Sequence, residues 1–332
     1  MRPRILFVVV ETGATRFLLP LWRRWLDSDA APDWRVVLAP AASRLVAREG
    51  LADALPVAAE LPAGGDGLDR ALGAWRPDGV LASAGDGHGL ERAAVAFARA
   101  RGAPVAQFVD TWLNYRRRFR NLADVGLPDR ILVVDEAARA EAAAEGLPAD
   151  RLRIVGHPAW EESPALPPAP RARVLFLGAP VARDFGRSLG YDEWDAWDVV
   201  RAAAERQPDL VARLWYGRHP EQTEVPAERL GPALLHEDSM ALLKETGTVI
   251  GMFSSPMVDA YLGGRRVISV QPGGSGPDPC PLSRHGRVPR VGTVAQLIAA
   301  LRSDRSAADD LRAALRGSGD RLDGFLRTEL LS

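Results

Sequence analysis

Short apolar runs alternate with amphipathic stretches along the whole chain. The apolar runs, such as Ile5–Val10 and Arg130–Val134, are rich in valine, isoleucine and leucine, as is typical of strands buried on both faces of a sheet. Between these runs, apolar residues recur with the spacing of one helix face, as in Phe17–Leu26. Helices that alternate with short buried strands predict βαβ units, so we expect an α/β fold built on parallel sheets.

The alternation occurs on both sides of a proline-rich stretch. The predicted strands are Ile5–Val10, Trp34–Ala39, Leu55–Ala59, Gly79–Ser83, Pro104–Val109, Arg130–Val134 and Leu152–Val155, and then Val174–Leu177, Leu210–Tyr216, Ala233–His236, Thr248–Met252 and Arg266–Val270. Between the two sets, Ser163–Arg173 contains four prolines and no periodicity, which is typical of a linker. We therefore predict two Rossmann-like domains that face a cleft, residues 1–163 and 174–332, joined by the linker 164–173.

Composition and charge exclude several classes of protein. With 332 residues, of which 47% are hydrophobic and 26% charged, each half can bury its own core. The formal net charge of -1 argues against nucleic-acid binding through a bulk positive field. Cys280 is the only cysteine, which excludes an intramolecular disulfide and a cysteine-rich zinc site. No apolar run is long enough for a signal peptide or a membrane span, so we expect a soluble cytoplasmic protein.

The stretch Gly247–Arg265 has the clearest pattern for ligand binding. A buried strand is followed by Ser254 and Ser255, by Pro256 at the start of a helix, and by a glycine pair at its end. A helix N-terminus at the carboxyl end of a parallel strand attracts phosphates. Asp259 lies one helical turn after Ser255 and is placed to reach ribose hydroxyls. An ordinary capped helix fits the pattern equally well.

Gln271, just after the last predicted strand, opens a Gly/Pro-rich loop and belongs to the same group. The loop runs through Cys280. We therefore predict that Arg218, Ser254, Ser255, Pro256, Asp259 and Gln271 bind a nucleotide sugar.

A glycine-rich turn follows the strand Gly79–Ser83. Its sequence, Gly85–Gly89, holds Asp86 and His88 between three glycines, which let the backbone approach a ligand closely. The alternative is a flexible turn whose aspartate caps the next helix. Asp86 is our candidate general base. Glu11, after the first strand, and His88 are rival candidates.

The segment Asp110–Phe119 interleaves aromatic and arginine residues after the strand Pro104–Val109. This composition suits stacking and anion contact, and a solvated basic helix explains it equally well; a nucleic-acid site is weakly supported. Together with Gly13, three of its residues, Asp110, Trp112 and Arg116, are predicted to bind an acceptor.

An arginine–histidine pair ends the strand Leu210–Tyr216. Arg218 and His219 are placed to meet a phosphate and a leaving group at the carboxyl end of a parallel strand. Isolated histidines are more often structural, yet three of the five here, His88, His157 and His219, follow predicted strands. We therefore predict a catalytic role for His219.

These motifs resemble those of nucleotide-sugar glycosyltransferases of the GT-B fold. The pairs His219-Pro220 and Ser254-Ser255 look like the HP and SS motifs of bacterial sialyltransferases and related CMP- or CDP-dependent transferases. In those families the histidine and the serines contact the nucleotide phosphate. Gly85-Asp86-Gly87 is similar to their acidic-acidic-glycine motif, whose carboxylate is the general base, but Gly85 replaces the first acidic residue.

The chain also resembles the UDP-HexNAc 2-epimerases, over Asp110, Pro128-Asp129-Arg130 and Gly156-His157-Pro158. Those enzymes have two glycines and paired glutamates where this chain has Ser254-Ser255-Pro256 and a single Asp259. The departure favours a transferase over an epimerase.

The resemblance implies a GT-B glycosyltransferase that moves a sugar from a nucleotide-sugar donor to a carbohydrate or glycolipid acceptor, in surface polysaccharide or glycoconjugate synthesis. The donor is expected on the second domain and the acceptor on the first. We expect no cofactor, no metal and no nucleic acid. Peripheral membrane contact, the oligomeric state, the nucleotide and the sugar stay open. The alternatives are an epimerase-like enzyme and a non-catalytic nucleotide-sugar-binding protein.

Overall fold

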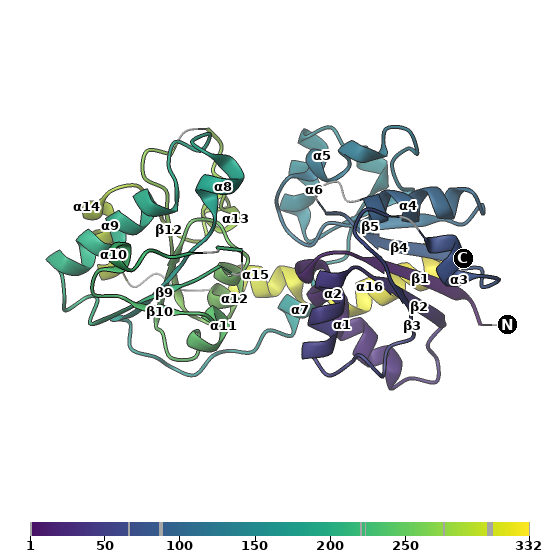
Figure 1. The fold of residues 1–332 in the computed structure, drawn as a ribbon, viewed down its shortest axis with the longest axis horizontal. Coiled ribbons are helices and arrows are strands. Elements are labelled where there is room, and N and C mark those ends of the chain that lie inside the picture. The colour runs from purple at the N-terminus through teal and green to yellow at the C-terminus, as the bar shows by residue number, and fades with distance from the viewer. Residues whose placement is uncertain are drawn as a thin grey trace. The chain divides into compact units, whose positions relative to one another are not determined.

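The chain forms two compact units. The computed structural model describes residues 2–65, 67–85, 89–219, 221–222, 224–274, 276–303 and 308–331. Unit 1 contains residues 1–162 and 313–332, and unit 2 contains residues 163–312 (Figure 1). Each unit is described by itself.

Unit 1 is built on a sheet of seven parallel strands in the order β3-β2-β1-β4-β5-β6-β7. The strands are β1 (Arg4–Val9), β2 (Asp33–Leu38), β3 (Val57–Glu60), β4 (Gly79–Ser83), β5 (Val105–Phe108), β6 (Arg130–Val133) and β7 (Leu152–Ile154). Every residue of β1 and β4 is buried apart from Arg4, as the continuous apolar runs predict. The expected parallel α/β architecture is confirmed.

Helices cover both faces of this sheet. They are α1 (Thr12–Leu26), α2 (Pro40–Arg48), α3 (Leu68–Leu72), α4 (Gly89–Arg99), α5 (Tyr115–Arg118), α6 (Glu136–Ala144), α7 (Pro158–Glu161) and α16 (Ser318–Phe325), with the short turns η1 (Arg120–Leu122), η2 (Ala149–Arg151) and the π-helical η3 (Leu326–Leu330). Helix α1 contacts α2, α7 and α16, whereas α4 contacts α3 and the strands β1, β4 and β5 (Figure 1). The sheet is therefore wound on both sides.

An aromatic cluster fills the space between β1 and α1. The ring of Phe7 meets Trp22, Trp25 and Trp34 edge-on, with centroid distances of 5.8, 5.6 and 5.9 Å. Edge-to-face pairs at such distances add stability beyond the area that they bury. This cluster anchors α1 to the sheet, and thereby positions the helix start at the carboxyl end of β1.

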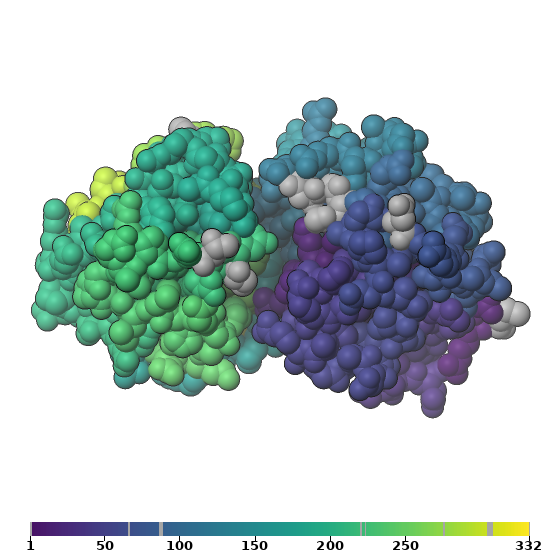
Figure 2. Space-filling model, in the orientation of Figure 1, coloured from purple at the N-terminus to yellow at the C-terminus, as the bar shows by residue number. Residues whose placement is uncertain are grey.

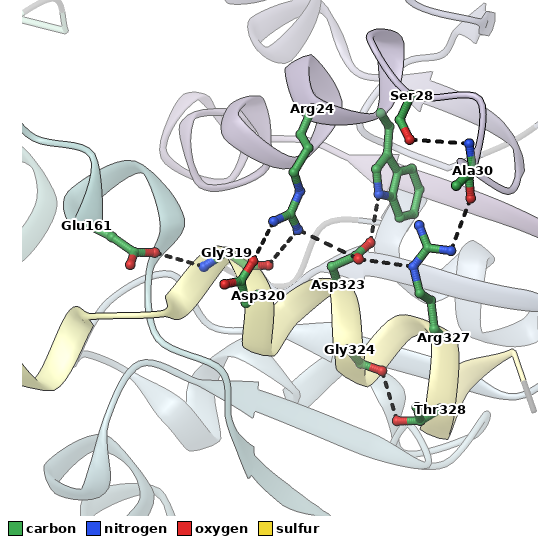
Figure 3. Close-up of polar contacts among 11 residues, drawn as sticks. Arg24, Ser28, Ala30, Glu161, Gly319, Asp320, Asp323, Gly324, Arg327 and Thr328 are labelled. Carbon is green, nitrogen blue, oxygen red and sulfur yellow. Dashed lines mark hydrogen bonds and ion pairs between the residues drawn. The ribbon is translucent and has the colours of Figure 1, made fainter.

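The last helix of the chain returns to unit 1. Trp25 donates its indole N–H to Asp323 Oδ1 at 2.7 Å, and the Arg24 guanidinium contacts Asp320 Oδ1 at 2.7 Å (Figure 3). The Glu161 carboxylate accepts from the backbone N–H groups of Gly317 and Gly319, and so caps α16, which has no side-chain cap of its own.

The structure thus differs from the expected boundary of the second domain. Sequence placed residues 174–332 together, but residues 313–332 belong to unit 1. Leu322, Phe325, Leu326 and Leu330 join the core around Phe7. From the side shown in Figure 2, the yellow C-terminal residues of unit 1 are hidden behind its purple and blue residues.

Unit 2 has a second parallel sheet, of six strands, in the order β10-β9-β8-β11-β12-β13. The strands are β8 (Arg173–Leu177), β9 (Arg213–Gly217), β10 (Leu234–His236), β11 (Thr248–Gly251), β12 (Arg266–Val270) and β13 (Arg290–Val291). The helices are α8 (Val181–Phe185), α9 (Glu193–Arg206), α10 (Ala227–Leu230), α11 (Ser239–Leu242), α12 (Pro256–Leu262), α13 (Pro281–Arg284), α14 (Val294–Arg302) and α15 (Asp309–Leu315), which runs into unit 1. The core packs Phe176 against Trp197 and Tyr216 at 5.1 and 5.4 Å.

We predict that Gly156→Ala destabilises unit 1 far more than Gly146→Ala. Both glycines have left-handed backbones, with φ of +82° and +91°, but only at Gly156 would a Cβ meet protein atoms, 2.6 Å from Ser318 Cβ. We expect a loss of about 1 kcal/mol for the control Gly146→Ala, from backbone strain alone, and about 3 kcal/mol for Gly156→Ala, where overpacking adds to it. Urea unfolding followed by tryptophan fluorescence measures both. Equal losses would contradict the close contact of the Gly156 turn with α16.

Candidate functional site

In unit 2, the loops after β8, β9, β11 and β12 emerge from the carboxyl edge of one parallel sheet. The chain passes from β8 outward through β9 and β10, then returns to β11 on the other side of β8. This reversal makes the β8–β11 edge a topological switch point, where open α/β sheets bind their ligands. The residues predicted to bind a nucleotide sugar follow β9, β11 and β12.

Ser254 and Ser255 lie between β11 and α12, as predicted, but neither caps the helix. Ser255 has helical backbone angles and makes no side-chain cap bond. Pro256 is the first residue of α12, and Asp259 is buried within it. Ser254 Oγ is buried and has no hydrogen-bond partner among the residues that the structure describes. A buried hydroxyl without a partner is costly, so this atom is a candidate to meet a ligand.

The turn after β9 is fixed by Gln222, which sequence reasoning missed. Gln222 is buried, its Oε1 accepts from the His219 backbone N–H at 3.0 Å, and its Nε2 donates to Tyr216 Oη at 3.0 Å. A Cβ at Gly178, just after β8, would lie 2.6 Å from Gln222 Oε1. The loops after β8 and β9 are therefore packed against each other through one amide.

Arg218 and His219 occupy this turn, each already engaged within unit 2. Arg218 Nε donates to Glu237 Oε2 at 2.6 Å. His219 Nδ1 accepts from the Glu221 backbone N–H at 3.2 Å, which leaves the proton of the neutral ring on Nε2. Burial lowers the pKa of His219, although the nearby carboxylate of Glu221 opposes the shift. The imidazole is therefore neutral at neutral pH, suited to donate one hydrogen bond. Its catalytic role stays a prediction.

In unit 1, the ends of β1 and β5 bring Glu11, Gly13 and Asp110 together. A Cβ at Gly13 would lie 2.5 Å from Asp110 Oδ2, so a side chain at this position would have to displace the carboxylate. Arg118 contacts Asp110 Oδ1 at 3.3 Å, and both side chains are only slightly exposed. Burial raises the pKa of Asp110; Arg118 opposes this shift, and the charge of Glu11 adds to it. Two coupled carboxyl groups at one sheet edge are a candidate acid–base pair.

The turn after β4 is fixed by a buried carboxylate, Glu91, which sequence reasoning also missed. Glu91, in the first turn of α4, is 2% exposed. Its carboxylate accepts from the hydroxyl of Ser83 and from the backbone N–H of Gly85, at 2.8 and 2.7 Å. The sequence signal that could have identified Glu91 is an acidic residue on the buried face of a helix. Asp86 and His88, our candidates in this turn, lie outside the described residues.

Trp112 and Arg116 are not brought together. The Trp112 ring is 1% exposed, stacks on Trp160 at 5.0 Å and donates to Asp135 Oδ1 at 2.8 Å. It supports the loop after β5 from inside, so it presents no surface for stacking here. Arg116 is exposed in α5, and its backbone N–H bonds Glu145. Arg118, rather than Arg116, is the arginine of this segment that pairs with Asp110.

His157, noted after the last strand of the first half, is a structural residue. Its ring is stacked on Trp160 at 3.8 Å and meets Phe17 edge-on at 5.0 Å. Its Nδ1 accepts from the Trp160 backbone N–H and so caps α7. Burial keeps the pKa of His157 well below its usual value, and nearby Arg16 lowers it further.

The architecture resembles solved structures over the length of the chain. S. aureus MnaA, in a co-structure with UDP, is 14% identical with a TM-score of 0.70, over 98% of this chain and 96% of that one. UDP-GlcNAc 2-epimerase from Neisseria meningitidis, bound to UDP-GlcNAc, is 12% identical with a TM-score of 0.69, over 98% and 100%. The glycotransferase of kitacinnamycin is 18% identical with a TM-score of 0.58, over 97% and 95%.

The fold is GT-B-like. At these identities the likeness concerns the fold alone, and the sialyltransferase-like motifs stay a prediction. No protein-family model matches the sequence, and no curated protein matches it. Within the described residues, no helix is both long and apolar enough to cross a membrane, and no group of three or more His, Cys, Asp or Glu side chains is arranged to hold a metal ion. The metal-independent reaction stays a prediction.

We predict that Arg118→Met destabilises the protein in a pH-dependent way. The folded pKa of Asp110 is already raised above 3.8, so the stability that this group contributes is present below the unfolded pKa and is lost as the pH rises through the folded pKa. Removal of the Arg118 charge moves that folded pKa higher. We expect a smaller loss at pH 5, about 1 kcal/mol, than at pH 8, about 3 kcal/mol, because more of the buried carboxyl is ionised and left without its partner charge at the higher pH.

Urea unfolding at the two pH values checks this expectation. Arg116→Met, an exposed arginine of the same helix, is the matched control and should cost less than about 0.5 kcal/mol at either pH. A loss for Arg118→Met that is the same at both pH values would show that the Asp110 carboxyl does not depend on Arg118.

Proposed function

We propose that this chain is a nucleotide-sugar enzyme in which unit 2 holds the nucleotide and unit 1 supplies acid–base carboxyl groups. The observation that carries the proposal is the Ser254 hydroxyl, buried beside the start of α12 at the switch point of unit 2, with no hydrogen-bond partner among the described residues. A buried hydroxyl without a partner in the protein is suited to donate a hydrogen bond to a phosphate oxygen. The neutral His219 suits the same role from the end of β9, which is separated from β11 by β8.

The Asp110 site supports chemistry on the sugar. Its carboxyl is buried, its pKa is raised by that burial, and it is coupled to Glu11. A carboxyl group whose pKa is raised, beside a second carboxyl group, offers an acid and a base at one sheet edge. In the part of the chain that the structure describes, Asp110 and Glu11 are the carboxyl groups we assign to this work; Asp86 remains a candidate base outside it.

The fold comparison favours 2-epimerisation of a UDP-N-acetylhexosamine. The two UDP-linked neighbours have TM-scores of 0.70 and 0.69, against 0.58 for the glycotransferase. Inversion of a carbon requires removal of a proton from one face and its return to the other, which two carboxyl groups can perform.

Sugar transfer to a carbohydrate acceptor is the second candidate. It is favoured by Ser254, Ser255 and the single Asp259, where the epimerases that the chain resembles have paired glutamates. This reaction needs a base for the acceptor hydroxyl and a stabilised leaving phosphate, for which Asp86 and His219 are the candidates.

Incubation with UDP-N-acetylglucosamine in D₂O, followed by mass spectrometry and NMR, tests the proposal. Epimerisation should give an epimer that carries one deuterium, because the removed proton is replaced from solvent. Transfer, with a carbohydrate acceptor and a panel of UDP and CMP sugars, should give free nucleotide and a new glycoside without deuterium. Asp110→Asn keeps the shape, removes the basicity and should lower turnover by about 10²-fold. Binding without either product would support the non-catalytic alternative, and absence of binding to every donor would refute the proposal.

We predict that Ser254→Ala combined with Ser255→Ala weakens nucleotide binding by about 1–3 kcal/mol, the scale of hydrogen bonds to a charged group. Titration calorimetry with UDP and CMP measures the loss. Ser303→Ala, at an exposed position after the last residue of α14, is the control and should leave affinity unchanged. A folded double mutant with the parent's nucleotide affinity would remove the phosphate from this position.

A further inference from the structure

Two buried side-chain oxygens lie on two loops that touch in unit 2. Tyr191 and Gln271 are 1% and 2% exposed. Neither Tyr191 Oη nor Gln271 Oε1 has a hydrogen-bond partner among the described residues. The loops meet where a Cβ on Gly273 would lie 3.4 Å from the carbonyl oxygen of Gly190. Buried polar atoms are nearly always paired, so two such atoms on adjoining loops need an explanation.

The Gln271 amide can face only one way. Its Nε2 donates to Ser269 Oγ at 2.9 Å and to Asp278 Oδ1 at 2.7 Å. Ser269 Oγ uses its own proton on the Met252 carbonyl at 2.7 Å, so it must accept from the amide. A flipped amide would set its oxygen against the Asp278 carboxylate. Gln271 Oε1 is therefore an acceptor of fixed orientation that has no donor among the described residues.

Tyr191 supplies the complementary group. It directly precedes Asp192, whose carboxylate accepts from the backbone N–H groups of Trp194 and Asp195 at 2.9 and 3.0 Å in the capping box of α9. This cap fixes the backbone beside the tyrosine. Burial raises the pKa of Tyr191, and Asp278 raises it further, so the phenol keeps its proton and can donate it.

We propose that Tyr191 and Gln271 form a subsite that recognises a hydroxyl group of the sugar in the bound nucleotide sugar. The inference rests on the proposed function. A sugar hydroxyl donates one hydrogen bond and accepts others, so it matches one fixed acceptor and one phenolic donor. Asp278 holds the acceptor in place, through Gln271 Nε2, while it is itself fixed by Ser283 Oγ at 2.6 Å.

The subsite lies where a ligand at the switch point would extend. Gln271 follows β12, which pairs with β11, and Ser254 follows β11. Both oxygens are shielded from solvent here, so the two loops must part when the sugar enters. Each loop lies outside the strands, so this movement leaves the sheet intact. The other possible occupant is a single trapped water, which would have a structural role only.

Tyr191→Phe distinguishes the two occupants, because it removes one hydroxyl and nothing else. We expect its affinity for a nucleotide sugar to fall about tenfold, the upper end for one neutral hydrogen bond, while its affinity for the free nucleotide stays within about twofold. Calorimetry uses UDP with UDP-N-acetylglucosamine, and CMP with CMP-N-acetylneuraminic acid. Gln271→Leu removes the acceptor and should give the same selective loss. Tyr261→Phe, in α12 with its hydroxyl near Asp310, is the matched control and should change neither affinity.

The outcomes separate the subsite from the proposed function. If the wild-type protein binds none of the four ligands, the proposed function fails, and the subsite with it. If the wild type binds a pair but Tyr191→Phe loses affinity for nucleotide and nucleotide sugar alike, or for neither, the hydroxyl holds a structural water and the subsite is refuted. Should Gln271→Leu fail to fold, Tyr191→Phe decides alone, since removal of an unpartnered hydroxyl should leave the melting temperature unchanged.

Discussion

Parallel pairing of strands is the constraint on which this structure depends. In a parallel sheet every strand ends at the same edge, and every crossover must pass over a face. Both sheets are wholly parallel, so each one gathers residues from separate segments at a single edge, without any local sequence similarity. In unit 1 these residues follow β1 and β5, and in unit 2 they follow β9, β11 and β12. The polar groups at these edges can then be held by buried side chains, such as Glu91 and Gln222, that the crossovers bring back to the strand ends.

The gathered residues divide the chemistry between the units. Unit 1 places carboxyl groups together: Asp110 is buried beside Arg118, and the charge of Glu11 raises the pKa of Asp110. Unit 2 concentrates neutral donors and acceptors, among them Ser254 and Gln271. Neutral groups suit recognition of a nucleotide sugar, because they add no charge that the phosphates must overcome, while coupled carboxyls suit proton transfer.

The sequence alone was sufficient to predict the strands and the sheet edge at which the polar residues gather. It was insufficient to predict which side chains contact one another there. Continuous runs of valine and isoleucine identified the buried strands, but β13, with only two residues, left no run to find. The pairing of Asp110 with Arg118 rather than Arg116, and the role of Tyr191, depend on side-chain directions between segments that only the fold brings together. The apolar face of α16 likewise did not indicate which sheet it would cover.

The return of residues 313–331 to unit 1 has a consequence for the order of events during synthesis. Unit 2 is in effect inserted within unit 1, since residues 163–312 separate the last strand of the first sheet from the helix that completes its core. On the ribosome, the Phe7 cluster stays incomplete until the whole of unit 2 has emerged. Unit 2, being continuous in sequence, can form its core first, although domains nearer the N-terminus usually fold earlier.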